Sequence, residues 1–379
     1  MSDIVADSAV GRVLADDREV MLRALQLARR GLGFVEPNPM VGAVIVDGQR
    51  RVIAEGFHQR FGEAHAEVHA IRAAGARTSG QRLFVTLEPC SHHGKTPPCA
   101  DAVIAAGFRE VVIGCPDPAE HVAGAGIRRL RDAGILVVTG LCQAEAEQLI
   151  QPFRKLMMRR RPWVHAKWAM TLDGKIASRT GHSQWISCEQ SRAVVHELRG
   201  RMDAIITAAG TMRHDDPLLT ARPAGARTAL RIVLDDDASS VRLNSRLITS
   251  LQHAPVLLCV AEPAADSEHV RSLQKAGAEI LVCTGCDRVE RAQSLLDALG
   301  QRQMTHCLLE GGAGLLGVFF DGGLVDEVHV FVAPKLVGGR QALGPVGGQG
   351  KERIPELPSL SGMRIRQLNS DVLIEGDVV

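Results

Sequence analysis

Two cysteines, two histidines and a lysine lie together in LEPCSHHGKTPPCADA, residues 87–102. Upstream, His65 and Glu67 stand in GEAHAEVHA, at the start of a predicted helix. A histidine, a glutamate two residues later, and then two cysteines, the first of them after a proline, form the order typical of zinc-dependent nucleoside and base deaminases. In such sites one histidine and two thiolates hold zinc and leave a fourth position for water. We therefore predict a catalytic zinc site formed by His65, Cys90 and Cys99.

This set of residues suits hydrolytic deamination. Bound zinc lowers the pKa of its water to about 7, which provides hydroxide as the nucleophile at neutral pH. Glu67, which is not a ligand, would take the released proton and deliver it to a ring nitrogen and to departing ammonia. Cys99 follows two prolines where a helix is predicted to begin, so we expect helix amides to favour its thiolate form.

The same residues also suggest two other kinds of metal site. His65 and His69 have the spacing of the metalloprotease motif HExxH, but that motif needs its glutamate directly after the first histidine. A structural zinc site with His92 or His93 as fourth ligand is the second alternative, although such a site has no use for the upstream glutamate. His69, His92 and His93 can also each be core or surface residues without a metal role.

Length and composition favour a soluble enzyme with a small substrate. The chain has 379 residues, a number that suggests two domains. Its net charge is +1, and it has no tyrosine and three tryptophans, so we expect neither a nucleic acid nor a membrane as partner. The N-terminus does not resemble a secretory signal, no apolar run is long enough to cross a bilayer, and nine scattered cysteines suit a reducing compartment. We predict a cytoplasmic protein.

The order of the predicted elements indicates two α/β domains. A helix over 16–32 precedes a hairpin over 40–56 with a tight turn at Asp47-Gly48, and helices and strands then alternate, which predicts a largely parallel sheet. The basic stretch QPFRKLMMRRRP interrupts this pattern, so we place domains at 1–152 and 153–379, with one larger domain as the alternative. Alternation resumes afterwards. The glycine-rich turn EGGAGLLG, at 310–317, predicts either amides for phosphates or close packing between a helix and a strand.

Several motifs together resemble the bifunctional deaminase-reductase family of riboflavin biosynthesis. They are PNPMVGAVIV, HAEVHA, TLEPCSHHGKTPPC, TLDGKIA, GHSQWIS, DDPLLTAR and LLEGGAGLLG. The resemblance implies hydrolysis of the amino group on C2 of a diaminopyrimidinone ribosyl phosphate, followed by NADPH reduction of the ribosyl side chain to ribityl. It also implies an N-terminal cytidine-deaminase-like three-layer domain, a C-terminal dihydrofolate-reductase-like domain, Zn²⁺ and NADPH as cofactors, and a homodimer.

The same resemblance assigns roles to individual residues. Zinc would be bound by His65, Cys90 and Cys99, with Glu67 as the proton shuttle. The substrate would be bound by Asn38, Lys95, Lys167, Ser183, Arg199, Leu219, Arg222 and Glu310. The nucleotide would lie at Ala169, Trp185, Thr211, Asp215, Gly312, Ala313, Gly314, Leu315, Leu316, Gly317 and Val318. Taken alone, Asn38 can be a turn residue, and each arginine a solvated surface charge.

The chain departs from the family pattern at two places. Ala119 and Glu120 stand where the family has asparagine and proline, which predicts a missing substrate hydrogen bond in the deaminase site. Asp236 stands where a small hydroxyl residue normally meets the nucleotide; a carboxylate near the 2′-phosphate would weaken the preference for NADPH over NADH. The remaining CxxC motif, Cys283 to Cys286, is interpreted as a coincidence because no second pair accompanies it.

Overall fold

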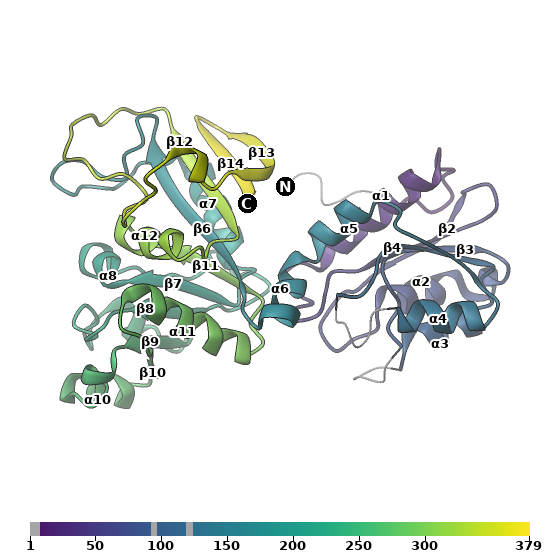
Figure 1. Cartoon of the computed structure of the whole chain (residues 1–379), viewed down its shortest axis with the longest axis horizontal. Coiled ribbons are helices and arrows are strands. Elements are labelled where there is room, and N and C mark those ends of the chain that lie inside the picture. Colours follow the sequence, from purple (N-terminus) through teal and green to yellow (C-terminus); the bar gives the residue numbers. More distant parts are fainter. Residues whose placement is uncertain (1–7, 92–96, 119–123) are drawn as a thin grey trace. The chain divides into compact units, whose positions relative to one another are not determined.

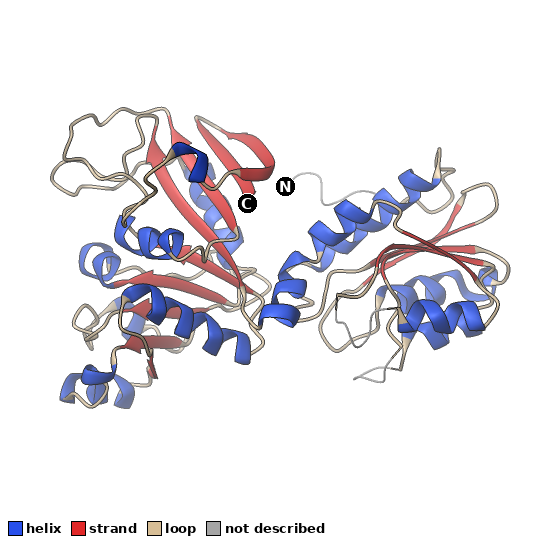
Figure 2. Cartoon of the chain, in the orientation of Figure 1, coloured by secondary structure: helices blue, strands red, loops and turns tan. Residues whose placement is uncertain are grey.

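The computed structural model describes residues 8–91, 97–118 and 124–379. The chain divides into two compact units, residues 1–159 and 160–379 (Figures 1 and 2). The expected domain division at 152/153 falls within helix α6 (Gln151–Arg159) and stays a prediction. Over the described ranges, we find no helix with the length and apolar character that a bilayer span requires.

The first unit is a five-stranded sheet between two layers of helices. Its strands are β1 (Gly42–Val46), β2 (Val52–Phe57), β3 (Arg82–Leu87), β4 (Glu110–Cys115) and β5 (Leu136–Thr139), in the order β2-β1-β3-β4-β5. Its other helices are α1 (Asp17–Ala28), α2 (Ala66–Ala74), α3 (Cys99–Ala105), α4 (Ala125–Asp132) and α5 (Gln143–Leu149). Helices α1 and α5 cover one face, and α2, α3 and α4 cover the other (Figure 1). β3, β4 and β5 are parallel, so the predicted largely parallel sheet is confirmed.

The predicted hairpin forms, but its turn is wider than expected. β1 and β2 pair antiparallel with Val46 opposite Val52, so residues 47–51 make the connection. The Asp47 carboxylate accepts hydrogen bonds from the amides of Gln49 (2.8 Å) and Arg51 (2.9 Å). Arg50, not Gly48, has the positive φ, 61°. The predicted two-residue turn is therefore wrong, because the aspartate side chain folds the backbone around itself.

Gly56, a glycine in β2, allows close packing of helix α2, which begins beside His65. A Cβ atom placed on Gly56 would lie 2.4 Å from the carbonyl oxygen of Ala66 and 2.5 Å from the amide nitrogen of Ala70. Both atoms belong to the backbone of α2, so neither can turn away. Glycine at this position therefore lets α2 lie directly on the sheet, with His65 at its N-terminal end.

We expect Gly56→Ala to push α2 off the sheet and to loosen the zinc site. Overpacking of this kind costs about 1–3 kcal/mol of unfolding free energy, and it displaces His65 relative to the two cysteines. Zinc release to a chromophoric chelator should become faster in the variant. Gly48→Ala is the matched control, because its Cβ would have only the tip of Arg109 nearby, at 3.7 Å. Equal release rates in the two variants would contradict this role for Gly56.

The second unit contains a nine-stranded mixed sheet. Its strands are β6 (Trp163–Thr171), β7 (Ala204–Ala208), β8 (Leu230–Leu234), β9 (Val256–Val260), β10 (Glu279–Val282), β11 (His306–Glu310), β12 (Glu327–Ala333), β13 (Leu360–Leu368) and β14 (Asp371–Val378), in the order β10-β9-β8-β7-β11-β6-β12-β14-β13. Its helices are α7 (Glu189–Arg199), α8 (Ala209–Asp215), α9 (Arg246–Thr249), α10 (Glu268–Lys275), α11 (Arg288–Gln301) and α12 (Ala313–Asp321). The strands from β10 to β12 are parallel, and β14 and β13 add an antiparallel edge.

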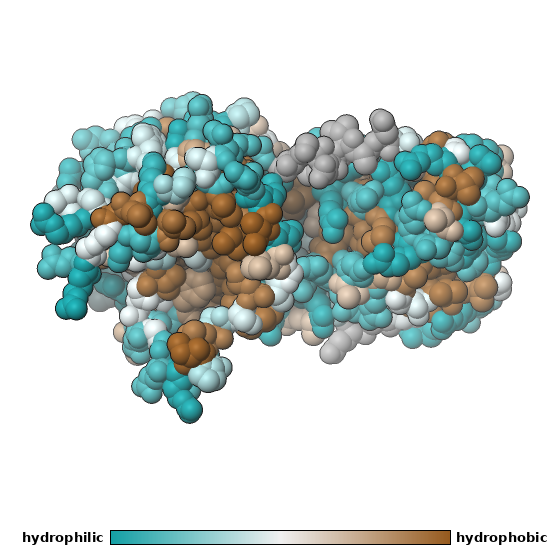
Figure 3. Space-filling model, turned by 90° about the horizontal axis from the view of Figure 1, so that it is seen from above, coloured by the Kyte–Doolittle hydropathy of each residue, from teal (hydrophilic) through white to brown (hydrophobic). Residues whose placement is uncertain are grey.

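Helices cover both faces of this sheet. α11 and α12 bury one face against β6, β7, β8 and β11, while α8, α9 and α10 pack on the other side of β7 to β9. α7 packs over Phe331 and Leu373 near the antiparallel edge. Edge strand β13 is largely exposed and carries Met363 (57% exposed) and Ile365 (61% exposed). Figure 3 shows apolar side chains gathered on one face of this unit.

Candidate active sites

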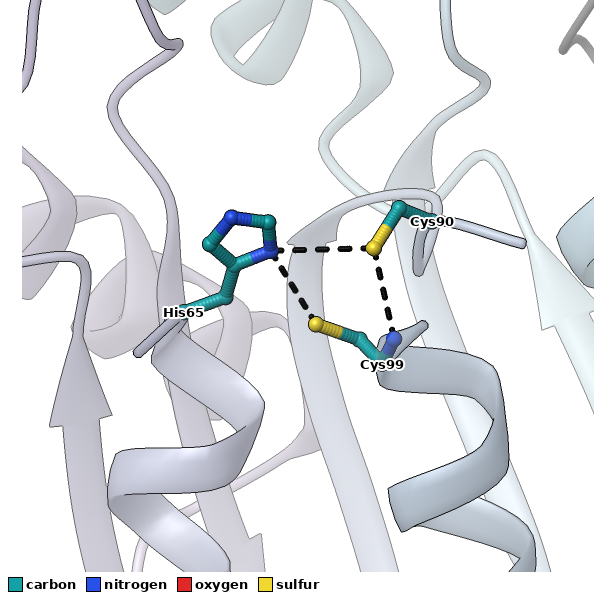
Figure 4. Close-up of side chains that lie close together, drawn as sticks. All are labelled: His65, Cys90 and Cys99. Carbon is teal, nitrogen blue, oxygen red and sulfur yellow. Dashed lines mark hydrogen bonds between the residues drawn. The ribbon is translucent and has the colours of Figure 1, made fainter. Parts of the chain in front are cut away.

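The predicted zinc ligands come together from three elements of the first unit. His65 is the residue before α2, Cys90 follows β3 by three residues, and Cys99 is the first residue of α3. Their side chains point toward one another (Figure 4). Cys90 and Cys99 are 25 and 34 positions from His65 in the sequence. They come close to His65 because α2 and α3 pack side by side on one face of the sheet.

The donor atoms have the spacing of a metal site. Nδ1 of His65 lies 3.1 Å from Sγ of Cys99 and 3.7 Å from Sγ of Cys90 (Figure 4). These atoms belong to one group within 4.8 Å of one another, and that group does not include His69 among the described residues. One nitrogen and two sulfurs are a donor set that zinc prefers. The residues present therefore fit zinc, with His65, Cys90 and Cys99 as its ligands.

The electrostatics of the two thiols differ from the expectation for Cys99. The Cys99 thiol hydrogen-bonds to Cys90, which lowers the pKa of Cys90 to about 4 and raises the pKa of Cys99. The first amide of α3 also donates to Sγ of Cys90, over 3.3 Å. The start of the helix therefore stabilises the thiolate of Cys90, and the expected effect of the helix amides on the Cys99 thiolate stays a prediction.

Glu67 is held beside this cluster with one oxygen unpaired. Its side chain lies in the first turn of α2 and is 3% exposed. Burial raises its pKa to about 7, against the opposing charge of His65. Oε2 has no hydrogen-bond partner among the described residues. A buried polar atom without a partner is costly in a purely structural role, and it is available for proton transfer.

Asn38 is oriented by a histidine that the sequence analysis did not select. Nδ1 of His58 lies 3.1 Å from the carbonyl oxygen of Ala64, so it carries the proton. Nε2 of His58 therefore accepts a hydrogen bond from the Asn38 amide at 3.3 Å. Burial lowers the pKa of His58 to about 4, which keeps the ring neutral. Its ring also meets that of His65 edge-on at 5.1 Å. Only the fold reveals this residue, because a lone histidine after a strand carries no signal.

Some expectations lie outside the described residues. Lys95, His92, His93, Ala119 and Glu120 belong to the ranges 92–96 and 119–123. Their expected roles stay predictions.

The predicted substrate residues of the second unit gather around one buried carboxylate. Glu310 ends β11, Lys167 stands opposite it in register on β6, and Arg199 ends α7. The Arg199 guanidinium donates to both Glu310 oxygens, at 2.6 and 2.9 Å, and Nζ of Lys167 lies 3.6 Å away. Although burial opposes ionisation, the two cations lower the pKa of Glu310 to about 2. The carboxyl ends of parallel strands form the usual ligand edge of such a sheet.

The other predicted substrate residues lie on loops around this edge. Leu219 is buried with φ 54°, and Arg199 donates to the next carbonyl, that of Thr220, over 3.3 Å. Arg222 is exposed, with Nη2 3.5 Å from Nε2 of His196. Ser183 and Trp185 line a pocket of about 450 Å³. Lys335 also lines this pocket and donates to the Trp185 carbonyl, and Arg192 stacks on the Trp185 ring at 4.7 Å.

The predicted nucleotide residues occupy the same edge. Thr211 and Asp215 belong to α8, which directly follows β7, and Ala169 lies on β6. The turn Gly312 to Val318 follows β11 and forms the first turns of α12. A Cβ atom placed on Gly312 or Gly314 would meet nothing within 4 Å. Open space before helix amides suits a phosphate, so these residues fit NADPH. Gly317, in the same turn, is required for close packing instead, because a Cβ atom on it would lie 2.4 Å from the backbone of Gly347.

Two further expectations concern Asp236, which follows β8, and the CxxC motif, which follows β10. Asp236 accepts a hydrogen bond from Nη2 of Arg291 at 3.2 Å, so an arginine balances its charge. Cys283 hydrogen-bonds to Cys259, and this contact lowers the pKa of Cys283. Cys283 and Cys286 are both free thiols.

Comparison with known proteins identifies a family for each of the two units. Residues 14–115 match the family model of the cytidine and deoxycytidylate deaminase zinc-binding region, and residues 162–374 match that of the RibD C-terminal domain. The riboflavin biosynthesis protein RibD of Actinobacillus pleuropneumoniae is 39% identical over 96% of both chains, and that of Escherichia coli is 39% identical over 94% of this chain and 98% of its own. The Acinetobacter baumannii RibD structure superposes with a TM-score of 0.83 at 34% identity, covering 96% of this chain and 99% of that chain.

The fold and the two sites define a zinc-dependent deaminase domain joined to a reductase domain. The chain belongs to the RibD family, and it is a bifunctional enzyme of riboflavin biosynthesis with both activities. The predicted family, the cytidine-deaminase-like and reductase folds, and zinc and NADPH as cofactors are confirmed.

Proposed function

We propose that the first unit removes the C2 amino group of a diaminopyrimidinone ribosyl phosphate, and that the second unit then reduces the ribosyl side chain to ribityl. The structure from Thermotoga maritima, a deaminase and reductase of this kind, is similar to this chain at 36% identity and a TM-score of 0.81, covering 96% of this chain and 98% of that one. The observation that carries the proposal is Glu67, a buried carboxylate beside three metal-binding side chains, one oxygen of which has no partner in the described part of the chain.

In the deaminase site we assign each residue one task. His65, Cys90 and Cys99 hold zinc, which when bound acts as a Lewis acid toward water and substrate. Glu67 takes one proton from the attacking water and delivers it to the ring nitrogen, and it then transfers the second proton of that water to the amino group, which leaves as ammonia. Asn38, oriented by His58, binds the pyrimidine ring. Lys95 binds the substrate phosphate.

In the reductase site the chain positions two reactants. NADPH, when bound, supplies the hydride. We assign the nucleotide to Ala169, Trp185, Thr211, Asp215 and the turn Gly312 to Val318. The substrate lies against Lys167, Ser183, Arg199, Leu219, Arg222 and Glu310. Lys167 and Glu310 hold the ribose hydroxyls, and Arg222 meets the phosphate, since a guanidinium can bond two oxygens at once.

A paired assay tests both activities and their order. Zinc-loaded protein is given the diaminopyrimidinone ribosyl phosphate, and ammonia release and NADPH oxidation are followed together. We expect ammonia first and NADPH oxidation that depends on it. Oxidation of NADPH without ammonia would leave only the reductase, and the absence of both signals would refute the proposal.

We expect Asp236→Ser to raise the preference for NADPH over NADH. Removing a carboxylate near the 2′-phosphate removes a repulsion, although Arg291 already balances part of it. The ratio of kcat/KM for the two nucleotides should therefore rise by about threefold to tenfold, which corresponds to about 0.7–1.4 kcal/mol. Asp266→Ser is the control, because that carboxylate is exposed and pairs with the exposed Arg271. An unchanged ratio would place Asp236 away from the 2′-phosphate.

We also propose a cytoplasmic homodimer. The exposed apolar side chains of Met363 and Ile365 on edge strand β13 support self-association, because a sheet edge with apolar side chains invites pairing with another chain. Light scattering after size exclusion should give twice the chain mass of 40.7 kDa.

A further inference from the structure

A second cluster of metal-binding side chains lies in the second unit, apart from the residues assigned above. It consists of His165 on β6 and Glu327 and His329 on β12. In the parallel pairing of these strands, Glu327 stands opposite His165. Since alternate residues of a strand face the same side, the three side chains project from one face of the sheet. One ligand atom from each lies within 4.8 Å of the other two.

The distances between these donor atoms match those around a tetrahedral ion. Nδ1 of His165 lies 3.2 Å from Nε2 of His329 and 3.2 Å from Oε2 of Glu327. Nε2 of His329 lies 3.7 Å from Oε1 of Glu327. Ligands about 2.0–2.1 Å from a tetrahedral zinc are roughly 3.3 Å apart. The deaminase zinc ligands of the same chain show the same spacing, 3.1 and 3.7 Å.

Each histidine is also oriented by a partner on its other nitrogen. Nδ1 of His329 donates to Oε1 of Glu375 at 3.0 Å, which leaves Nε2 free of its proton and facing the cluster. Nε2 of His165 lies 3.0 Å from Nδ1 of His306, a partner for the nitrogen that points away. Such outer contacts are typical of histidines that bind metals, because they fix the tautomer and the ring plane.

Burial and charge favour a cation at this place. His165, His306 and His329 are 7%, 4% and 3% exposed. Although burial opposes ionisation, a hydrogen bond from His165 keeps the pKa of Glu327 below its usual range. Glu327 also accepts from Nε1 of Trp163 at 3.4 Å and from Nη2 of Arg364 at 3.1 Å. The Arg364 side chain is 52% exposed, so it can turn into solvent when a cation takes its place.

We propose that His165, Glu327 and His329 bind a divalent transition metal ion, with Zn²⁺ as the probe. Two imidazoles and one carboxylate are a known zinc donor set. An ion at this position would tie β6 to β12, the strand pair that also carries Lys167. The site is independent of the deaminase zinc, and it does not depend on the proposed substrates.

Zinc stoichiometry of the full chain tests this site. Protein stripped with a chelator and reloaded should bind two zinc ions per chain. Cys90→Ser/Cys99→Ser removes the thiolate ligands and should keep one ion, and His329→Gln should also keep one. His306→Gln should bind the second ion about 10-fold or more weakly, as expected for a residue that orients a ligand. His253→Gln, an exposed histidine outside the cluster, should still bind two.

Cobalt provides a readout that needs no variant. Co²⁺ bound to thiolates gives an intense near-ultraviolet charge-transfer band, and Co²⁺ bound to imidazole and carboxylate gives only weak visible bands. Titration of the wild-type chain should therefore show visible absorption from two ions but thiolate bands from one. Binding of one ion, with none left in Cys90→Ser/Cys99→Ser, would overturn the proposal. Glu327→Gln is a second variant of the same site, in case His329→Gln does not fold. Two zinc ions bound by both variants would also overturn the proposal.

Discussion

Glu67→Gln should lower the rate of ammonia release by about 10²–10⁴-fold, the usual contribution of a general acid–base group. The amide fills the same volume but cannot carry a proton between water and the ring. Because the carboxylate is not a zinc ligand, zinc content should stay at the wild-type value. Reduction of a substrate that has already lost its amino group should also be unchanged, because that reaction belongs to the second unit.

The same substitution separates function from stability. An unpaired buried oxygen such as Oε2 of Glu67 costs about 1–3 kcal/mol. Because burial disfavours the charged carboxylate, the neutral amide should leave the first unit at least as stable as before. Glu63→Gln is the matched control, since Glu63 is exposed just before the helix that carries Glu67. Equal ammonia release by both variants would remove Glu67 from the reaction.

The zinc site could be predicted because short stretches of sequence contain its ligands in a recognisable order. His65, Cys90 and Cys99 lie at spacings that few other functions use. His65 and Cys99 stand at the starts of α2 and α3, and Cys90 follows β3 by three residues. The hairpin of β1 and β2 was predictable for the same reason. Its turn was not, because the Asp47 carboxylate organises five residues through two amide contacts that composition does not reveal.

Contacts that depend on strand register could not be predicted from the sequence. Residues 165 and 329 are 164 positions apart, and each histidine stands inside an apolar strand where it resembles a single buried residue. Only the parallel pairing of β6 with β12 brings them together. Helix α5 and the antiparallel hairpin of β13 and β14 were also not predicted individually, because their exposed strand and short helix give weak apolar patterns.

Glu310→Gln should destabilise the second unit and remove reductase activity. Glu310 is the shared partner of Arg199 and Lys167, and its loss leaves two partly buried cations beside a neutral amide. Breaking a buried ion pair costs about 3–5 kcal/mol, so Tm should fall by roughly 6–20 °C for a unit of this size. Reductase kcat/KM should fall by about 10²-fold, because the displaced side chains no longer align the substrate.

Tryptophan fluorescence reports the thermal unfolding of the second unit alone, because all three tryptophans belong to that unit. They are Trp163, Trp168 and Trp185. Glu279→Gln is the matched control, because its ion pair with Arg302 is exposed and worth about 0–1 kcal/mol. Equal Tm values for the two variants would contradict the central position of Glu310.

The pH dependence of stability provides the sharper test. The folded pKa of Glu310 is about 2, below its ordinary value of 4.5, so the folded state favours the carboxylate. Its contribution is therefore complete above pH 4.5 and is lost as the pH falls through the folded pKa. Over that range the wild-type Tm should fall more steeply than that of Glu310→Gln, and the two curves should converge at the acid end. Parallel curves would mean that the pKa of Glu310 is the same in the folded and the unfolded protein, and the account of Arg199 and Lys167 as its charged partners would fail.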